Sequence, residues 1–282
     1  MQKLFGRRIV ITGRHLIAQF ALIMVTVNGY AGVIETITLQ PGLADGKDNS
    51  MSRGGEGTEG RANENSGGSD ALTIGMIGNH GQVHRVLMQF DLPTLNPGDT
   101  LLSARLGLTV FETAVSSAPI EIYRLNHIWV EGTQTGPDAN PPDGATWQTF
   151  DGSNAWPGIS GFRSLDGSGF SLLSAEINDP LGSGTLFNNG EISWFDLDVA
   201  KVSEWMTGAF TNNGFLVRSL NENSGSSSIA FASSEYFDPG LHPIFEFTID
   251  SVPEPSTIVM FLIGAVGLFG YRWRRHRAGC PG

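Results

Sequence analysis

The sequence has almost no cysteine. Cys280, close to the C-terminus, is the only one, so no disulfide can form within residues 32–250. This excludes a small scaffold held together by disulfides. Stability has to come from a hydrophobic core, to which a bound metal could add. The 219 residues from 32 to 250 are enough to bury such a core in one domain.

Basic residues are scarce in the same region. Residues 32–250 contain nine lysines and arginines against 27 aspartates and glutamates, a formal charge of −18. A surface of this charge repels nucleic-acid phosphates and anionic lipid head groups. It also disfavours strongly anionic polysaccharides, unless a cation bridges them or the few arginines cluster. Nucleic acid is therefore excluded as a partner.

Long amphipathic helical patterns are scarce as well. Gly, Ser, Asn and Asp interrupt the chain at short intervals, and aromatic residues are plentiful. This spacing is typical of an all-β sandwich or barrel. We predict an all-β sandwich or barrel over residues 32–250, with about nine to ten strands and one short helix. The helix is expected within 190–208, which begins as a strand and ends at Gly208.

The clearest strand lies in 84–95, HRVLMQFDLPTL. Val86, Met88 and Phe90 share one face of it, and Pro93 ends it. Other strands are expected within 33–39, 71–78, 100–113, 119–132, 212–220, 228–234 and 242–250. Two regions predict loops instead. Residues 42–70 have almost no large apolar side chain and predict a long, flexible, glycine-rich loop, and residues 132–169 are also rich in loop.

The N-terminal end is basic and then apolar. Lys3, Arg7, Arg8 and Arg14 precede a mostly apolar stretch, 16–27, and small residues at 29 and 31. This pattern predicts a secretory signal peptide over residues 1–31, which signal peptidase removes. A first transmembrane helix is the alternative. On either interpretation, residues 32–250 leave the cytoplasm.

The C-terminal end has the reverse order, apolar and then basic. Residues 258–271 carry no charge, and as a helix they would span about 21 Å, less than the roughly 30 Å core of a bilayer. An arginine cluster follows, and positive charge beside an apolar segment marks the cytoplasmic side of a membrane. We expect a short transmembrane helix here, with a buried core helix as the alternative.

Residues 251–277 resemble the PEP-CTERM sorting signal. The residues that carry the resemblance are Val252, Pro253, Glu254, Pro255 and Ser256, then the apolar run, then Arg272, Arg274 and Arg275. The resemblance implies an exosortase-type membrane protease that recognises and removes the tail, in a host that is usually a Gram-negative bacterium making exopolysaccharide. It implies transient passage through the inner membrane to the cell envelope, surface or extracellular matrix. The final residues, AGCPG, depart from the pattern.

Residues 45–250 are similar to the DNRLRE-type domain, akin to carbohydrate-binding module family 96. The similarity lies in the order of six stretches: 84–95, 101–110, 120–132, 145–156, 195–219 and 231–247. The resemblance implies a jelly-roll-like antiparallel β-sandwich that is non-catalytic and is found on secreted and surface proteins, some of which bind polysaccharide. The long segment 42–70 and the inserted loop 157–190 depart from the family.

Binding sugar without catalysis requires flat aromatic faces with polar groups nearby. Trp156, in a polar loop, is the best candidate for an exposed face; Tyr236 is second, and Trp147 is a third candidate that fits a core position better. Asp45, Asp48 and Asp70, which lie in or beside the glycine-rich loop, are candidate ligands for a calcium ion, although no EF-hand spacing is present.

These features predict an exported, non-catalytic surface or matrix protein that contacts extracellular polysaccharide. One alternative is a structural or adhesive matrix protein without a specific ligand. Another is a polysaccharide lyase or glycosidase, because carboxylates are abundant; sequence spacing does not fix the distance between two carboxylates in space.

Overall fold

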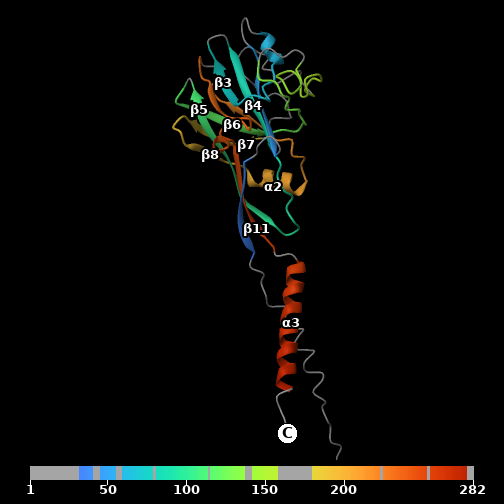
Figure 1. Cartoon of the computed structure of the whole chain (residues 1–282). Helices are drawn as coiled ribbons and strands as arrows, with labels where there is room; N and C mark the ends of the chain where they lie inside the picture. The colour runs from blue at the N-terminus through green and yellow to red at the C-terminus, as the bar shows by residue number, and fades with distance from the viewer. Residues whose placement is uncertain are drawn as a thin grey trace, which may run out of the picture. The chain divides into compact units, whose positions relative to one another are not determined.

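The computed structural model describes residues 32–40, 45–54, 59–78, 81–113, 115–136, 142–157, 180–222, 225–252 and 255–277. The chain divides into two compact units (Figure 1). One is a β domain, Ile34–Ser251; the other includes the C-terminal helix α3, Pro255–Arg277. Residues 1–31, the predicted signal peptide, lie outside the described residues.

The β domain is an all-β antiparallel sandwich, as the sequence predicts. Its strands are β1 (Val33–Leu39), β2 (Gly46–Ser52), β3 (Ala71–Ile77), β4 (Gln82–Phe90), β5 (Thr100–Thr113), β6 (Ser117–Arg124), β7 (Pro180–Phe187), β8 (Ile192–Asp196), β9 (Phe215–Ser219), β10 (Ile229–Ala232) and β11 (Ile244–Ser251). In the described part of the chain they are hydrogen-bonded in the order β1-β11-β5-β10-β3-β4-β9-β6-β7, and β2 pairs with β4 while β8 pairs with β5.

Two long strands organise the sandwich. β5 lies between β11 and β8, so that Arg105 is opposite Glu246 on one side and Asp196 on the other. β4 lies between β2 and β9, with Val86 opposite Ser50 and Val217. β10 joins the two groups of strands, because it pairs with both β5 and β3.

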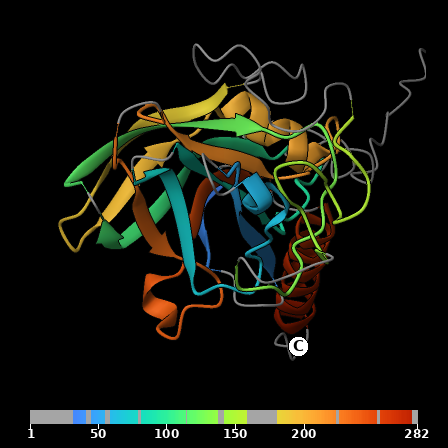
Figure 2. The same cartoon turned by 90° about the horizontal axis from the view of Figure 1, so that it is seen from above.

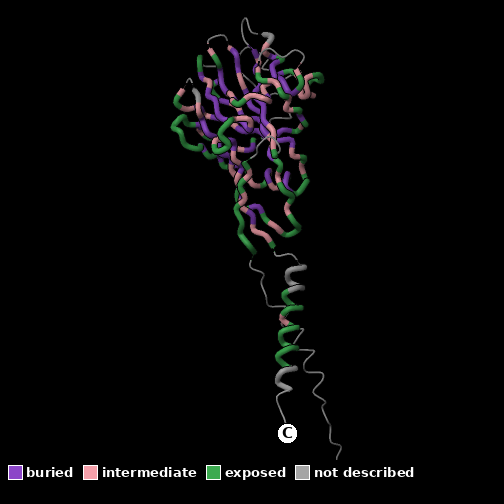
Figure 3. Tube along the Cα trace, viewed as in Figure 1, coloured by how far each residue is buried: buried purple, intermediate pink, exposed green. Residues whose placement is uncertain are grey.

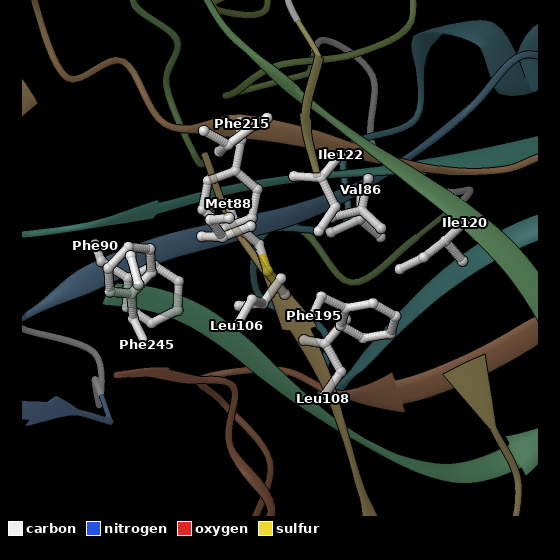
Figure 4. Packing of buried hydrophobic residues seen from close by; sticks show 14 of the residues in the cluster. Val86, Met88, Phe90, Leu106, Leu108, Ile120, Ile122, Phe195, Phe215 and Phe245 are labelled. Atoms are coloured by element: carbon white, nitrogen blue, oxygen red, sulfur yellow. The ribbon is translucent and has the colours of Figure 1, made fainter. Parts of the chain in front are cut away.

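The core lies between these strands, and buried residues are concentrated in the β domain (Figure 3). Val86, Met88 and Phe90 of β4 point into it together, which confirms the face predicted from their alternation (Figure 4). The Phe90 ring packs 5.3 Å from that of Phe245 on β11. Burying a side chain of this size contributes about 1.5–3 kcal/mol.

The short helix α2 (Val199–Thr207) confirms the predicted helix and lies alongside the strands (Figure 2). Asp198 caps its start, because the side chain accepts hydrogen bonds from the backbone N–H groups of Ala200 and Lys201. Gly208 ends it in the left-handed conformation, at φ 75°. The buried face consists of Val202, Trp205 and Met206.

The prediction of a flexible loop over 42–70 is wrong for much of this segment. It contains β2, which pairs in register with β4, and the 3₁₀ helix η2 (Glu59–Asn63). Asn49, Ser50 and Ser52 of β2 are buried although they are polar. A further layer of chain covers Asn49, whose side chain donates to the carbonyl of Ala145 at 2.7 Å, whereas the Ser50 hydroxyl donates to the carbonyl of Thr73 at 3.1 Å.

This further layer is the covering loop, which we define as the described residues 125–136 and 142–157. The expected strand 119–132 ends at Arg124, and the chain then runs across the outer face of β4. A second hydrophobic cluster forms there, with Leu87 from β4 and Trp129 and Trp147 from the covering loop. The domain therefore has two cores on the two faces of β4.

The predicted inserted loop 157–190 contains a strand at its end. β7 pairs with β6 and approaches β8 closely at its glycines. A Cβ on Gly184 would lie 2.7 Å from the Phe195 ring, so the position requires glycine. Residues 158–179 lie outside the described residues.

Candidate functional site

Two of the three aromatic residues expected to contact sugar are buried. Trp156 is 6% exposed, and its ring nitrogen donates to the carbonyl of Thr146 at 3.0 Å. Its ring meets that of Phe150 edge-on at 6.1 Å. Trp147 is 1% exposed, beneath the guanidinium of Arg85. The expectation that Trp156 offers an exposed face is wrong, because the covering loop folds its own aromatic rings inward.

Tyr236 lies in an aromatic group at the surface. Its half-buried ring stacks on the ring of Phe111 of β5, with the ring centres 4.9 Å apart, and the ring of Phe237 packs at a tilt against Tyr236, 4.6 Å away. Phe237 is 82% exposed. The structure thus places Tyr236 where an external ligand can reach the group, with Phe237 as its most accessible member.

Trp194 is an exposed aromatic residue to which the sequence analysis assigned no role. It lies on β8 and is 37% exposed, between the buried Ser193 and Phe195. The sequence of β8, ISWFD, is enough to predict this exposure. If Phe195 faces the core, the alternation of side chains along a strand places Trp194 on the opposite, outer face.

Arg105 and Glu246 surround Trp194 with polar groups. The Arg105 guanidinium lies 4.1 Å from the centre of the Trp194 ring, close enough for a cation–π interaction. The same guanidinium donates to a Glu246 carboxylate oxygen at 2.7 Å. Both side chains are partly exposed, at 40% and 24%. This is an aromatic face with hydrogen-bond donors and acceptors beside it.

A buried ion pair joins β4 to the residues that follow β9, beside Trp147 of the covering loop. Arg85 and Glu222 form a two-pronged pair with nitrogen-to-oxygen distances of 2.8 and 2.7 Å, and both side chains are at most 3% exposed. The Arg85 guanidinium lies 4.9 Å from the centre of the Trp147 ring. A pair desolvated to this degree is held in a fixed geometry, and losing either partner leaves a buried charge.

Three carboxylates gather near β2, beneath the covering loop. A Glu131 oxygen accepts the backbone N–H of Asp48 at 2.7 Å, and an Asp48 oxygen accepts the backbone N–H of Ser234 at 2.9 Å. The Ser234 hydroxyl donates to Glu235 at 3.0 Å. Lys47 donates to the carbonyl of Trp129. The group therefore joins β2 to the covering loop and to the segment after β10.

Burial raises the pKa of all three carboxyl groups. For Glu131 the pKa rises from 4.5 to about 7, chiefly through desolvation, against the hydrogen bond from Asp48. The pKa of Asp48, which is 3% exposed, lies well above its usual range because of burial and then the charge of Glu235. The pKa of Glu235 is raised by burial too. Neutral pH is thus unfavourable to full ionisation of the group.

The structure does not join the three predicted calcium ligands into a site. Asp48 is buried, whereas Asp45 and Asp70 are exposed. The Asp45 and Asp70 carbonyls instead accept backbone N–H groups, from Asp91 and Ser233. Among the described residues, no group of three or more His, Cys, Asp or Glu side chains is arranged to hold a metal ion.

The C-terminal unit contains the residues of the expected sorting signal. Helix α3 begins at Pro255 and runs through the arginine cluster to Arg277, while Pro253 and Glu254 lie outside the described residues. Large apolar side chains on it are exposed, among them Phe261 at 78% and Phe269 at 75%. We expected a transmembrane helix here; of the helices that the structure describes, none is long and apolar enough to cross a membrane.

Comparison with known protein families identifies a PEP-CTERM protein-sorting motif at residues 251–277. The match covers Val252 to Ser256 of the expected signal and its arginines at 272, 274 and 275. A search of curated proteins found no match to this chain. The similarity of residues 45–250 to the DNRLRE-type domain has no support from these comparisons and stays an expectation.

Proposed function

We propose that this chain is an exported, non-catalytic protein of the cell surface or exopolysaccharide matrix, which contacts glycan through its β domain. The observation that carries the proposal is the PEP-CTERM motif at residues 251–277, directly after a β-sandwich. The motif implies export and processing by an exosortase-type system. Signal peptidase is the partner we assign to residues 1–31.

The exposed apolar side chains of α3 support the sorting part of the proposal. Phe261, Leu268 and Phe269 each expose more than 70% of their surface. Apolar surface of this kind indicates contact with another protein or with lipid. An exosortase-type membrane protease that recognises the helix is the partner we propose for it.

The composition of the β domain supports an extracellular location. Its formal charge of −18 keeps it soluble and its lack of cysteine makes its fold independent of the redox state of the compartment. Of the three carboxylates with raised pKa, Glu131 and Asp48 accept backbone N–H groups and Glu235 accepts the Ser234 hydroxyl, which fits a structural role better than catalysis. Contact with glycan follows the expected likeness to carbohydrate-binding modules.

The sorting part is tested by fractionating host cells that produce either the natural chain or a variant with Pro253, Glu254 and Pro255 all changed to alanine. We expect the natural protein at the cell surface or in the matrix, without its tail. The triple variant should keep its tail and remain with the inner membrane. Natural protein found in the cytosol with both ends uncut would contradict the proposal.

A structural or adhesive matrix protein without a specific sugar ligand is the second candidate. It is favoured by the burial of Trp156 and Trp147, which removes two of the three expected sugar-contacting rings. Failure of the protein to bind any glycan on an array would support this candidate. Release of reducing sugar from host exopolysaccharide would instead support a third, an enzyme.

A further inference from the structure

One outer face of the β domain carries exposed aromatic side chains beside strand β5. They come from β5 itself, from β8 and from the segment after β10. On β5, Leu106, Leu108 and Val110 point into the core. Arg105, on the opposite side of the strand from Leu106, and Phe111, where the pairing with β10 shifts register, are both partly exposed on the outer face. Gly107 has no side chain on this face.

Trp194 lies against this bare backbone. Gly107 is opposite Trp194 in the pairing of β5 with β8, and a Cβ on Gly107 would lie 2.9 Å from the Trp194 ring. The glycine lets the ring approach the strand, and Arg105 packs against it at 4.1 Å. The ring is thereby held in place while 37% of the residue remains exposed.

A second aromatic group lies further along the same face. Phe111 is four residues from Gly107, a distance of about 13 Å along an extended strand. Tyr236 stacks on Phe111, and Phe237 packs at a tilt against Tyr236. Ile192, which is opposite Thr109 and 37% exposed, lies between the two groups. The face thus offers an apolar path with an aromatic group at each end.

We infer that this outer face of β5 and β8 is a glycan-binding surface, on which a neutral polysaccharide chain lies along β5. One sugar ring packs on Trp194, where Arg105 and Glu246 bind its hydroxyl groups, and another packs on Phe237 and Tyr236. The inference rests on the proposed contact with glycan and identifies the site of that contact.

Charge decides between neutral and anionic chains. Residues 32–250 carry a formal charge of −18, and Arg105 is already paired with Glu246. A polyanion would meet long-range repulsion and no excess positive charge at the face. The C–H faces of neutral sugars pack well on aromatic rings, and their hydroxyl groups match an arginine and a carboxylate.

The test measures retardation of the full-length protein in gels that contain a dissolved α-glucan, a mixed-linkage β-glucan, a galactomannan or, as the anionic case, alginate. The variants are Trp194→Ala, Trp194→Phe and Phe237→Ala. Ile128→Ala is the control, because Ile128 is 64% exposed but belongs to the covering loop, which packs on the outer face of β4. Melting curves establish that each variant is folded.

We expect retardation by at least one neutral polysaccharide. Trp194→Ala and Phe237→Ala should each weaken it about fivefold to tenfold, Trp194→Phe should retain most of the binding, and Ile128→Ala should change nothing. Normal binding by both alanine variants would overturn the inference and leave the proposed function standing. Retardation by alginate alone would also overturn the inference. No binding to any polysaccharide would overturn the glycan part of the proposed function as well.

Discussion

Glu131, Asp48 and Glu235 have carboxyl pKa values above the ordinary range, so they link the stability of the β domain to pH. A carboxyl group with a raised pKa binds its proton more tightly in the folded state. Its stabilising effect is complete below the unfolded pKa and is lost as pH rises through the folded pKa. For Glu131 this window runs from 4.5 to about 7. Asp48 and Glu235 act in the same direction.

We therefore predict that Glu131→Gln raises the melting temperature at pH 8 relative to the natural protein, and that the two proteins differ less at pH 5. The glutamine oxygen can still accept the N–H of Asp48, but it carries no charge beside Asp48 and Glu235. Lys47 is the cation near the group, and its pKa is lowered by burial. Thermal melts from pH 4.5 to 8 measure the effect.

The matched control is Glu191→Gln, because Glu191 is exposed. It should leave the pH profile unchanged. If the melting temperature of the natural protein rose between pH 5 and 8, or if Glu131→Gln had the profile of the natural protein, the assignment of this window to Glu131 would be wrong.

The Arg85–Glu222 pair predicts a larger effect on stability. Glu222→Gln leaves the Arg85 guanidinium buried without its counter-charge and should lower the free energy of unfolding by about 3–5 kcal/mol. Glu246→Gln, in the partly exposed pair with Arg105, should cost less than about 1 kcal/mol. Urea denaturation of both variants compares them. Equal losses would mean that burial does not decide the effect.

Two tryptophans show which parts of the site could be predicted from sequence. The exposure of Trp194 is local information, because it follows from the alternation of β8 around Phe195. The burial of Trp156 is not: its polar neighbours indicate a surface loop, but Phe150 and the Thr146 carbonyl enclose it after the covering loop has folded. The conformation of the covering loop itself, which its polar sequence does not predict, decided that outcome.

Among the elements, α2 is the one whose ends the sequence specifies most clearly. Its start depends on Asp198, which accepts the N–H of Ala200 at 3.0 Å and of Lys201 at 3.2 Å. We predict that Asp198→Ala lowers the free energy of unfolding by about 1 kcal/mol. The nearby exposed Asp196→Ala should change it by less than about 0.5 kcal/mol. Similar losses in urea melts of the two variants would contradict the capping role.

Strand prediction succeeded where one face of the strand is apolar and failed elsewhere. β4 and β5 alternate, so their core faces could be assigned. Apart from the buried Met51, β2 consists of small and polar residues, whose burial depends on partners far away in the sequence: Asn49 donates to the Ala145 carbonyl of the covering loop, and Ser50 to the Thr73 carbonyl of β3. β7 has glycine at 182 and 184, which indicates a loop until the close approach of β8 is known.

At the scale of the whole molecule, the two units contain different functional features. The β domain holds the buried pairs, the two cores and the aromatic outer face. The C-terminal unit holds the PEP-CTERM motif, which could be predicted from sequence because its residues are contiguous. The ligand-contacting face could not, since it is assembled from β5, β8 and the segment after β10.

Removal of the C-terminal tail during export is the central claim about this protein. Intact-mass spectrometry of the protein isolated from the surface or matrix of its host tests this directly. We predict a chain that begins near residue 32 and lacks the apolar helix and the arginine cluster after residue 256. A mature surface protein whose mass includes residues 257–282, Cys280 among them, would contradict the account.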